Sequence, residues 1–199
     1  MIGMQTKNLS IVTSKRSGYV FIDASNLWAA QKIKGKVFDF QKLKSFLVNT
    51  YDFSSIQIYY YTAYPKEGTR DYSTESKHKF YYYLNKALGI KVVKKELKQI
   101  VTQTSLGEVV IEKGNMDVEM AIDCVHHIDS YDTAIFFTGD SDFLALVNYI
   151  KNKGKDVYIY SSKNNISREL KTGASGFFDI LKIEEDVWGK EIVHKNKNK

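Results

Sequence analysis

The sequence is poor in cysteine and proline: it contains one of each, Cys124 and Pro65, among 199 residues. A single cysteine excludes an internal disulfide and a zinc site built from cysteines, and it favours a reducing compartment. Long apolar runs are also missing. Residues 1–18 hold no apolar stretch of signal-peptide length, and no segment approaches the ~20 apolar residues of a transmembrane helix. We therefore expect a cytoplasmic protein without a membrane partner.

Linkers, internal repeats and the common nucleotide-binding loops are absent as well. No Gly/Ser-rich or proline-rich stretch divides the chain, and 43% of its residues are hydrophobic, which suits one globular domain. We expect a polar leader over residues 1–17, a single domain over 18–185 and a basic tail over 186–199. Neither a GxGxxG pattern nor a Walker phosphate loop occurs, so a nucleotide cofactor is not supported.

The charge balance is mildly basic, with 29 basic and 23 acidic residues and a formal net charge of +6. Three of the lysines lie within residues 195–199. One interpretation is a solvated tail on an ordinary surface. The other is attraction to phosphates, because lysine and arginine supply the sequence-independent part of nucleic-acid affinity. The charge alone does not decide between them.

Short apolar segments alternate with segments of helical periodicity. Strands are predicted where the apolar or aromatic run is short and continuous, at residues 19–22, 56–61, 134–137 and 157–160. Helices are predicted over residues 39–50, 73–88, 117–125, 143–150 and 166–171. Residues 90–113 are strand-like but polar, with a hairpin turn at 104–107, and 178–183 is a candidate last strand. This order predicts an α/β fold with a mostly parallel central sheet flanked by helices.

Two of the predicted buried strands end in aspartate. Asp23 closes the first strand, Asp140 follows the 134–137 strand, and Asp142 comes two residues later. If the two strands are neighbours, Asp23 and Asp140 emerge about 5 Å apart at one edge of the sheet. Carboxylates that close repel each other, and a hard divalent cation with oxygen ligands, Mg²⁺ or Mn²⁺, removes the conflict. Each aspartate taken singly is also a common helix N-cap or turn residue.

Other polar residues near these strand ends have two interpretations each. Asp117 begins a helix and is a third candidate acid. Asn26 either contacts a metal-bound water or phosphate, or caps the turn after Asp23. Thr138 and Ser141 are either phosphate contacts or hydroxyls that stabilise the turn.

The helix from Asp117 carries Val118, Ala121, Ile122 and Val125 on one stripe, which predicts its buried face. On that wheel Asp123 falls on the polar side, so geometry alone makes it a solvated residue.

Another ambiguous feature is the run of tyrosines at 81–83. These side chains either stack on nucleic-acid bases or cover a helix flank, and the flank is the commoner use.

Four motifs, in their order along the chain, resemble the NYN domain family, which includes LabA-like proteins and belongs to the PIN-like nuclease superfamily. They are FIDASN (21–26), EKGNMDVEMAID (112–123), TGDSDFLALV (138–147) and GASGFFDI (173–180), and the resemblance spans roughly residues 19–183. It implies a Rossmann-like PIN fold with a metal-dependent ribonuclease site. Ala24 departs from the glycine that family members often have at this position.

The resemblance implies that Asp23, Asp117, Asp140 and Asp142 form the catalytic, metal-binding set for Mg²⁺ or Mn²⁺. It also places Asn26 beside this set and makes Lys113 a phosphate contact. Asp123 would be a lesser member of the set, in contrast to its place on the polar side of the helical wheel. The expected function is hydrolysis of single-stranded or loop RNA, with Asp23 and Asp140 as principal ligands. Since PIN-like domains often pair, a homodimer is compatible with the resemblance.

Three alternatives stay open at this point. The first is an RNA-binding or regulatory module of the same fold without turnover, since fold membership does not establish catalysis. The second is a DNA-directed nuclease, because nothing in the sequence reads the 2′-hydroxyl. The third is a glycosyltransferase, in which Asp140-Ser141-Asp142 would be a metal-binding DxD; the short chain and the separate acid at Asp23 argue against it.

Overall fold

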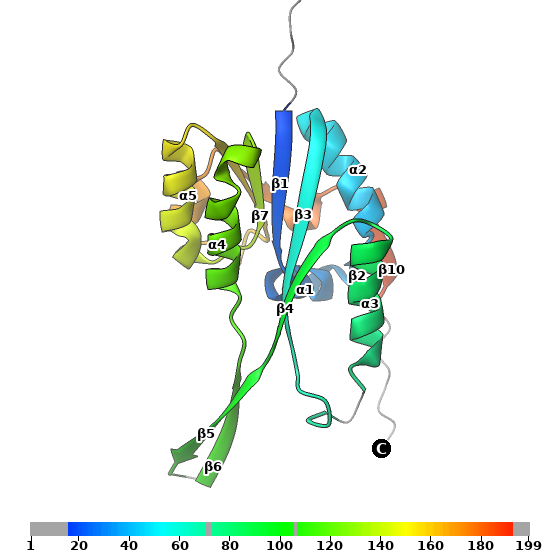
Figure 1. Cartoon of the computed structure of the whole chain (residues 1–199), viewed down its shortest axis with the longest axis vertical. Coiled ribbons are helices and arrows are strands. Elements are labelled where there is room, and N and C mark those ends of the chain that lie inside the picture. Colours follow the sequence, from blue (N-terminus) through cyan, green and yellow to red (C-terminus); the bar gives the residue numbers. More distant parts are fainter. Residues whose placement is uncertain (1–15, 71–72, 106, 193–199) are drawn as a thin grey trace, which may run out of the picture.

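A parallel sheet forms the centre of the computed structural model, which describes residues 16–70, 73–105 and 107–192. Within these residues the sheet has six strands in the order β4-β3-β1-β7-β8-β9 (Figure 1), and its neighbouring strands pair in parallel. Its strands are β1 (Arg16–Asp23), β3 (Phe53–Tyr64), β4 (Lys91–Glu96), β7 (Thr133–Phe137), β8 (Asp156–Ser161) and β9 (Gly176–Asp179). The predicted α/β fold with a mostly parallel sheet is confirmed.

Helices cover both faces of this sheet. One face packs against α1 (Ala24–Lys34), α2 (Phe40–Tyr51) and α3 (Glu75–Lys86), and the other against α4 (Asp117–His126), α5 (Leu144–Asn152) and α6 (Arg168–Gly173). Successive residues of β1 point to opposite faces, so Val20 and Ile22 enter one core while Phe21 enters the other. This two-sided burial is why the central strands are continuous apolar runs.

Two small antiparallel pairs complete the fold. Strands β5 (Lys98–Thr104) and β6 (Gly107–Lys113) form the predicted hairpin, which extends away from the body of the molecule (Figure 1). Strands β2 (Lys36–Phe38) and β10 (Trp188–Glu191) form the second antiparallel pair. Short 3₁₀ turns lie at Ile128–Ser130, Ser141–Phe143, Ile180–Lys182 and Glu185–Val187.

The domain boundaries differ from the prediction at both ends. Strand β1 begins at Arg16, so residues 16 and 17 belong to the sheet rather than to a leader. Trp188 is buried and stacks on Phe38 with ring centroids 4.2 Å apart, which makes β10 part of the fold rather than of a tail beginning at 186. Residues 1–15 and 193–199 lie outside the described residues.

The buried face of α4 was predicted wrongly. Met120 and Cys124 are buried against the sheet, whereas Val118 is 68% exposed and Ile122 61% exposed. The apolar stripe read from the sequence therefore points to solvent. None of the helices in the described part of the chain is long and apolar enough to cross a membrane.

Candidate metal centre

The site lies between β1 and β7, where the strand order of the parallel sheet reverses. Strand β1 pairs with β7 in a register that puts Ile22 opposite Phe137, and the chain builds outwards from these two strands in opposite directions. Ligands of open α/β sheets bind beyond the carboxyl ends of the strands at such a switch point. The two strands that end in Asp23 and precede Asp140 are therefore neighbours, as the sequence analysis assumed.

Three carboxylates converge at this edge. Asp117, Asp140 and Asp142 each present an oxygen, and these atoms all lie within 4.8 Å of one another. Asp117 comes from the first turn of α4, whereas Asp140 and Asp142 come from the loop and 3₁₀ turn after β7. Segments far apart in the sequence thus meet in one cluster, which we call the acidic cluster.

The acidic cluster is electrostatically unfavourable without a counter-charge. The pKa of Asp117 is raised above its ordinary value of 3.8, first by burial and then by the charges of Asp140, Asp23 and Asp142. A hydrogen bond from Asn115 Nδ2 to Asp117 Oδ2, at 2.5 Å, opposes this shift. Repulsion among like charges is what a bound cation would relieve.

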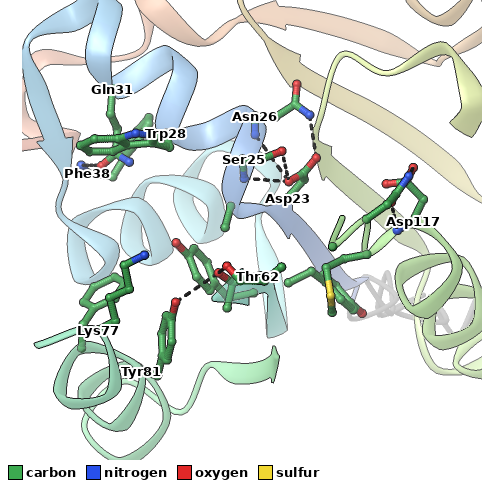
Figure 2. Close-up of a pocket in the computed structure, with 18 of the residues that line it drawn as sticks. Asp23, Ser25, Asn26, Trp28, Gln31, Phe38, Thr62, Lys77, Tyr81 and Asp117 are labelled. Atoms are coloured by element: carbon green, nitrogen blue, oxygen red, sulfur yellow. Dashed lines mark hydrogen bonds between the residues drawn. The ribbon is translucent and has the colours of Figure 1, made fainter. Parts of the chain in front are cut away.

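Asp23 lies beside the acidic cluster but outside the group of three. Its carboxylate caps α1: Oδ1 accepts from the backbone nitrogen and hydroxyl of Ser25, both at 2.8 Å, and Oδ2 accepts from Asn26 Nδ2 at 2.6 Å (Figure 2). Asp23, Asp117 and Asp140 nevertheless line the same cavity. Asp23 is therefore an N-cap and a neighbour of the cluster at once.

Asn26 connects the ends of β1 and β7. Its Nδ2 donates to Asp23, and its Oδ1 accepts from the backbone nitrogen of Gly139 at 3.2 Å. Both polar groups of its amide are thus used inside the protein. Asn26 fixes the positions of the acids relative to each other, rather than merely capping a turn.

The loop after β7 is held by short-range hydrogen bonds. Thr138 is fully buried, and its Oγ1 accepts from the backbone nitrogen of Asp140 at 3.2 Å, while Asp140 Oδ1 accepts from that of Asp142 at 3.0 Å. Ser141 is exposed, and its hydroxyl has no hydrogen-bond partner among the described residues. Thr138 thus stabilises the turn, and Ser141 is the hydroxyl that stays open.

Gly139 is required by close packing in the same loop. A Cβ added there would lie 2.5 Å from the carbonyl oxygen of Asn165 and 2.5 Å from Ser161 Oγ. Neither distance is tolerable, and the backbone oxygen cannot rotate away. Glycine at 139 is therefore a packing requirement of the loop that carries Asp140.

Two predicted supporting residues do not join the acidic cluster. Asp123 lies nearly two turns beyond Asp117 on α4, and its Oδ2 accepts from the Tyr61 hydroxyl at 2.9 Å. The wheel argument placed Asp123 in solvent, but it is partly buried and bonded to the sheet. Lys113 is exposed at the end of β6, next to Gly114, which lines the cavity.

The lysines of β4 have partners within the protein. Lys91 donates to the Tyr59 hydroxyl at 2.9 Å, and Lys95 forms an ion pair with Glu119 at 2.7 Å. Lys94 lies over the rings of Tyr64 and Tyr81, at 5.8 and 5.7 Å from their centroids. These lysines add positive charge at one side of the sheet.

A cavity of about 960 Å³ adjoins the acidic cluster. One end holds the acids, and the rest lies between α1, α3 and the end of β3 (Figure 2). Its wall residues Trp28 and Gln31 could not be recognised in the sequence, because α1 shows no clear apolar stripe and was not predicted. The aspartate N-cap at 23 and the left-handed Gly35, with φ of 73°, are the signals that mark the two ends of this helix.

Comparison with known proteins identifies a family for most of the chain. The family model described as "NYN domain" matches residues 18–181. The match includes every residue of the acidic cluster and the strands that position it.

The chain is also similar to individual proteins and to a solved structure. The chain is 27% identical over 168 residues to the low amplitude and bright protein LabA of Synechococcus elongatus, covering 84% of this chain and 86% of that protein. It is 29% identical over 121 residues to an uncharacterized protein of Methanocaldococcus jannaschii, covering 59% of this chain and 47% of that protein. A crystal structure of a Vibrio parahaemolyticus protein of unknown function superposes with a TM-score of 0.64 at 20% identity, covering 93% and 99% of the two chains. That last likeness establishes the fold alone.

Proposed function

The chain belongs to the NYN domain family, and we propose that it is a metal-dependent nuclease that hydrolyses RNA phosphodiester bonds at the acidic cluster. The observation that carries the proposal is the convergence of Asp117, Asp140 and Asp142, with their oxygens within 4.8 Å of one another at the switch point of the sheet. Clustered carboxylates with a perturbed pKa, as at Asp117, are typical of functional sites.

The residues fit a hard divalent cation. The cluster offers carboxylate oxygens only, and oxygen ligands suit Mg²⁺ and Mn²⁺ rather than softer metals. The free cysteine, Cys124, is buried against Tyr131, with its Sγ 3.2 Å from that hydroxyl, so it takes no part in the site. When bound, the cation would lower the pKa of a coordinated water and neutralise charge on the attacked phosphate.

The protein's own residues have distinct roles in this proposal. Asp117, Asp140 and Asp142 hold the cation. Asp23 adds negative charge from the neighbouring strand, and Asn26 keeps Asp23 and the Asp140 loop in register through its two hydrogen bonds. Asp142 is the most exposed of the three ligands, so it faces the solvent from which water reaches the cluster.

The test is cleavage of labelled RNA and DNA oligonucleotides in Mn²⁺, in Mg²⁺ and in chelator. The proposal predicts that RNA is cut with either ion, that chelator stops the reaction, and that added metal restores it. An Asp140→Asn preparation, purified identically, distinguishes the protein's activity from a contaminant. Cutting of DNA alone would favour a DNA-directed nuclease, and tight RNA binding without cleavage would favour a binding module.

A further inference from the structure

Phosphodiester hydrolysis leaves most of the cavity beside the acidic cluster without a role. The chemistry needs the acids at one end, whereas the remaining wall is largely aromatic, formed by Trp28, Phe38, Phe40, Tyr60, Phe80 and Tyr81. A volume of about 960 Å³ is that of a ligand site rather than a packing defect. We propose that this cavity is a binding subsite for an unpaired nucleobase, next to the phosphate that lies at the acidic cluster.

The aromatic wall has the shape and chemistry for stacking. Trp28 is 45% exposed and makes no aromatic, cation–π or hydrogen-bond contact within the described residues, so its ring face is free for a ligand. Figure 2 shows Trp28 and Phe38 at the end of the cavity opposite Asp117, with Tyr81 on another wall. Tyrosine and tryptophan rings bind single-stranded nucleic acid by stacking on its bases.

Two polar groups inside the apolar wall have no protein partner. Gln31 is 8% exposed; its Oε1 accepts from the Phe38 nitrogen at 2.8 Å, but its amide nitrogen makes no hydrogen bond among the described residues. Tyr60 is also 8% exposed, and its hydroxyl has no hydrogen-bond partner there either. Neither atom is sealed from solvent, so both are open to a ligand that enters the cavity. The edge of a nucleobase supplies the matching acceptors.

The cavity wall away from the acids also includes Lys77 and Tyr81 (Figure 2). Tyr81 does not compete for the base edge, because its hydroxyl is 3.2 Å from Thr62 Oγ1 and the two satisfy each other. A paired base cannot reach this wall without leaving its duplex. A strand bound in this cavity therefore presents an unpaired base to the aromatic wall.

The position of the phosphate at the acidic cluster rests on the proposed nuclease function, but the base subsite does not. Binding is therefore measured in chelator, where no metal-dependent cleavage occurs. The probes are an eight-nucleotide single strand of RNA or DNA, the same strand with abasic positions, and the matched duplex. Wild type is compared with Trp28→Ala and Trp28→Phe, and with Tyr82→Ala, which removes a 67% exposed ring of α3 outside the cavity.

The expected result is that Trp28→Ala weakens single-strand binding at least about fivefold, while Trp28→Phe retains most of the affinity and Tyr82→Ala retains all of it. Abasic strands and duplex bind more weakly than the single strand. Bound bases also quench tryptophan fluorescence in wild type, and quenching disappears in Trp28→Phe, where only the buried Trp188 remains. The RNA and DNA arms show which polymer supplies the base.

The base subsite is overturned if Trp28→Ala binds the strand like wild type, if abasic strands bind equally well, or if no strand binds. Cleavage without Trp28-dependent binding would leave the nuclease standing and remove the subsite. Trp28-dependent binding without cleavage would leave the subsite standing and remove the nuclease.

Discussion

The side-chain oxygen of Asn26 accepts a hydrogen bond from the backbone nitrogen of Gly139 at 3.2 Å. These residues are 113 positions apart: Asn26 lies in the first turn of α1, just after β1, and Gly139 in the loop after β7. Because the amide nitrogen of Asn26 also holds Asp23, at 2.6 Å, one side chain sets the spacing between the two strand ends that carry the acids. The acidic cluster therefore depends on a neutral residue that is not one of its ligands.

Replacing Asn26 by alanine is expected to lower cleavage about 10- to 100-fold, as loss of an outer partner of a metal site typically does. The carboxylates themselves remain, but Asp23 and the Gly139 loop lose the partner that holds them in register. Cleavage rates and Mn²⁺ affinity are measured together, with Asn152→Ala, an exposed residue at the end of α5, as control. Unchanged rates in Asn26→Ala would show that the bridge has no role in positioning.

The Gly139→Ala substitution is expected to destabilise the protein by about 1–3 kcal/mol, because the added methyl group overlaps the Asn165 carbonyl and Ser161 Oγ. Thermal unfolding measures the loss. Combining it with Ser161→Ala should recover only part of the stability, since the backbone oxygen remains. Full recovery in the double variant would mean that the Asn165 carbonyl is not the limiting contact.

Asp117→Asn should stabilise the metal-free protein at neutral pH. The pKa of Asp117 is raised in the folded state. Between the ordinary and the raised pKa the folded protein therefore binds more protons than the unfolded chain, so stability falls as pH rises. Above the raised pKa the ionised carboxylate costs stability in full. The penalty is absent below the ordinary value of 3.8, where both states are protonated. We expect a gain of about 1 kcal/mol or less at pH 7 in chelator, fading towards pH 3.

With Mn²⁺ present, wild type should instead be more stable than Asp117→Asn, because a cation that binds only the folded wild type stabilises it by mass action. Melting temperatures with and without metal test both halves. A variant that gained stability from Mn²⁺ as wild type does would contradict Asp117 as a ligand.

Asp123→Asn is expected to keep cleavage within about threefold of wild type. Asp123 lies six positions beyond Asp117 on α4, roughly 9 Å along the helix, and its carboxylate accepts a hydrogen bond from the Tyr61 hydroxyl. Asparagine retains an oxygen for that hydroxyl. The measurement is the cleavage rate at saturating Mn²⁺, and a loss as large as that of a ligand variant would place Asp123 in the chemistry.

Periodicity predicted the central strands because their residues are buried on both faces, as Val20, Phe21 and Ile22 are. It failed for α4, where the stripe of Val118 and Ile122 is apolar but exposed, while Met120 and Cys124 pack inwards. A helical wheel finds an apolar face but not the direction in which the chain places it. Helix α1 was not predicted because its apolar residues form no clear stripe, and one side of it, with Trp28 and Gln31, lines a cavity.

The acids of the site could be predicted because each follows a recognisable strand or begins a helix. That Asp117 joins Asp140 and Asp142 came only from the family resemblance, because periodicity does not show where the α4 N-terminus lies relative to the β7 loop. The bridge made by Asn26 was equally invisible: its partner, the Gly139 nitrogen, is a backbone atom that no sequence pattern marks. Trp28 and Gln31 become meaningful only once the cavity is seen.

The central claim, that the acidic cluster cuts RNA with the help of a divalent cation, is tested most directly by single-turnover cleavage of RNA in Mn²⁺. Wild type is compared with Asp117→Asn and Asp140→Asn, and with Asp129→Asn as control, since Asp129 is exposed in the turn after α4. We expect at least about a 100-fold loss in each cluster variant and wild-type rates in the control. Folded cluster variants that cut RNA as fast as wild type would contradict it.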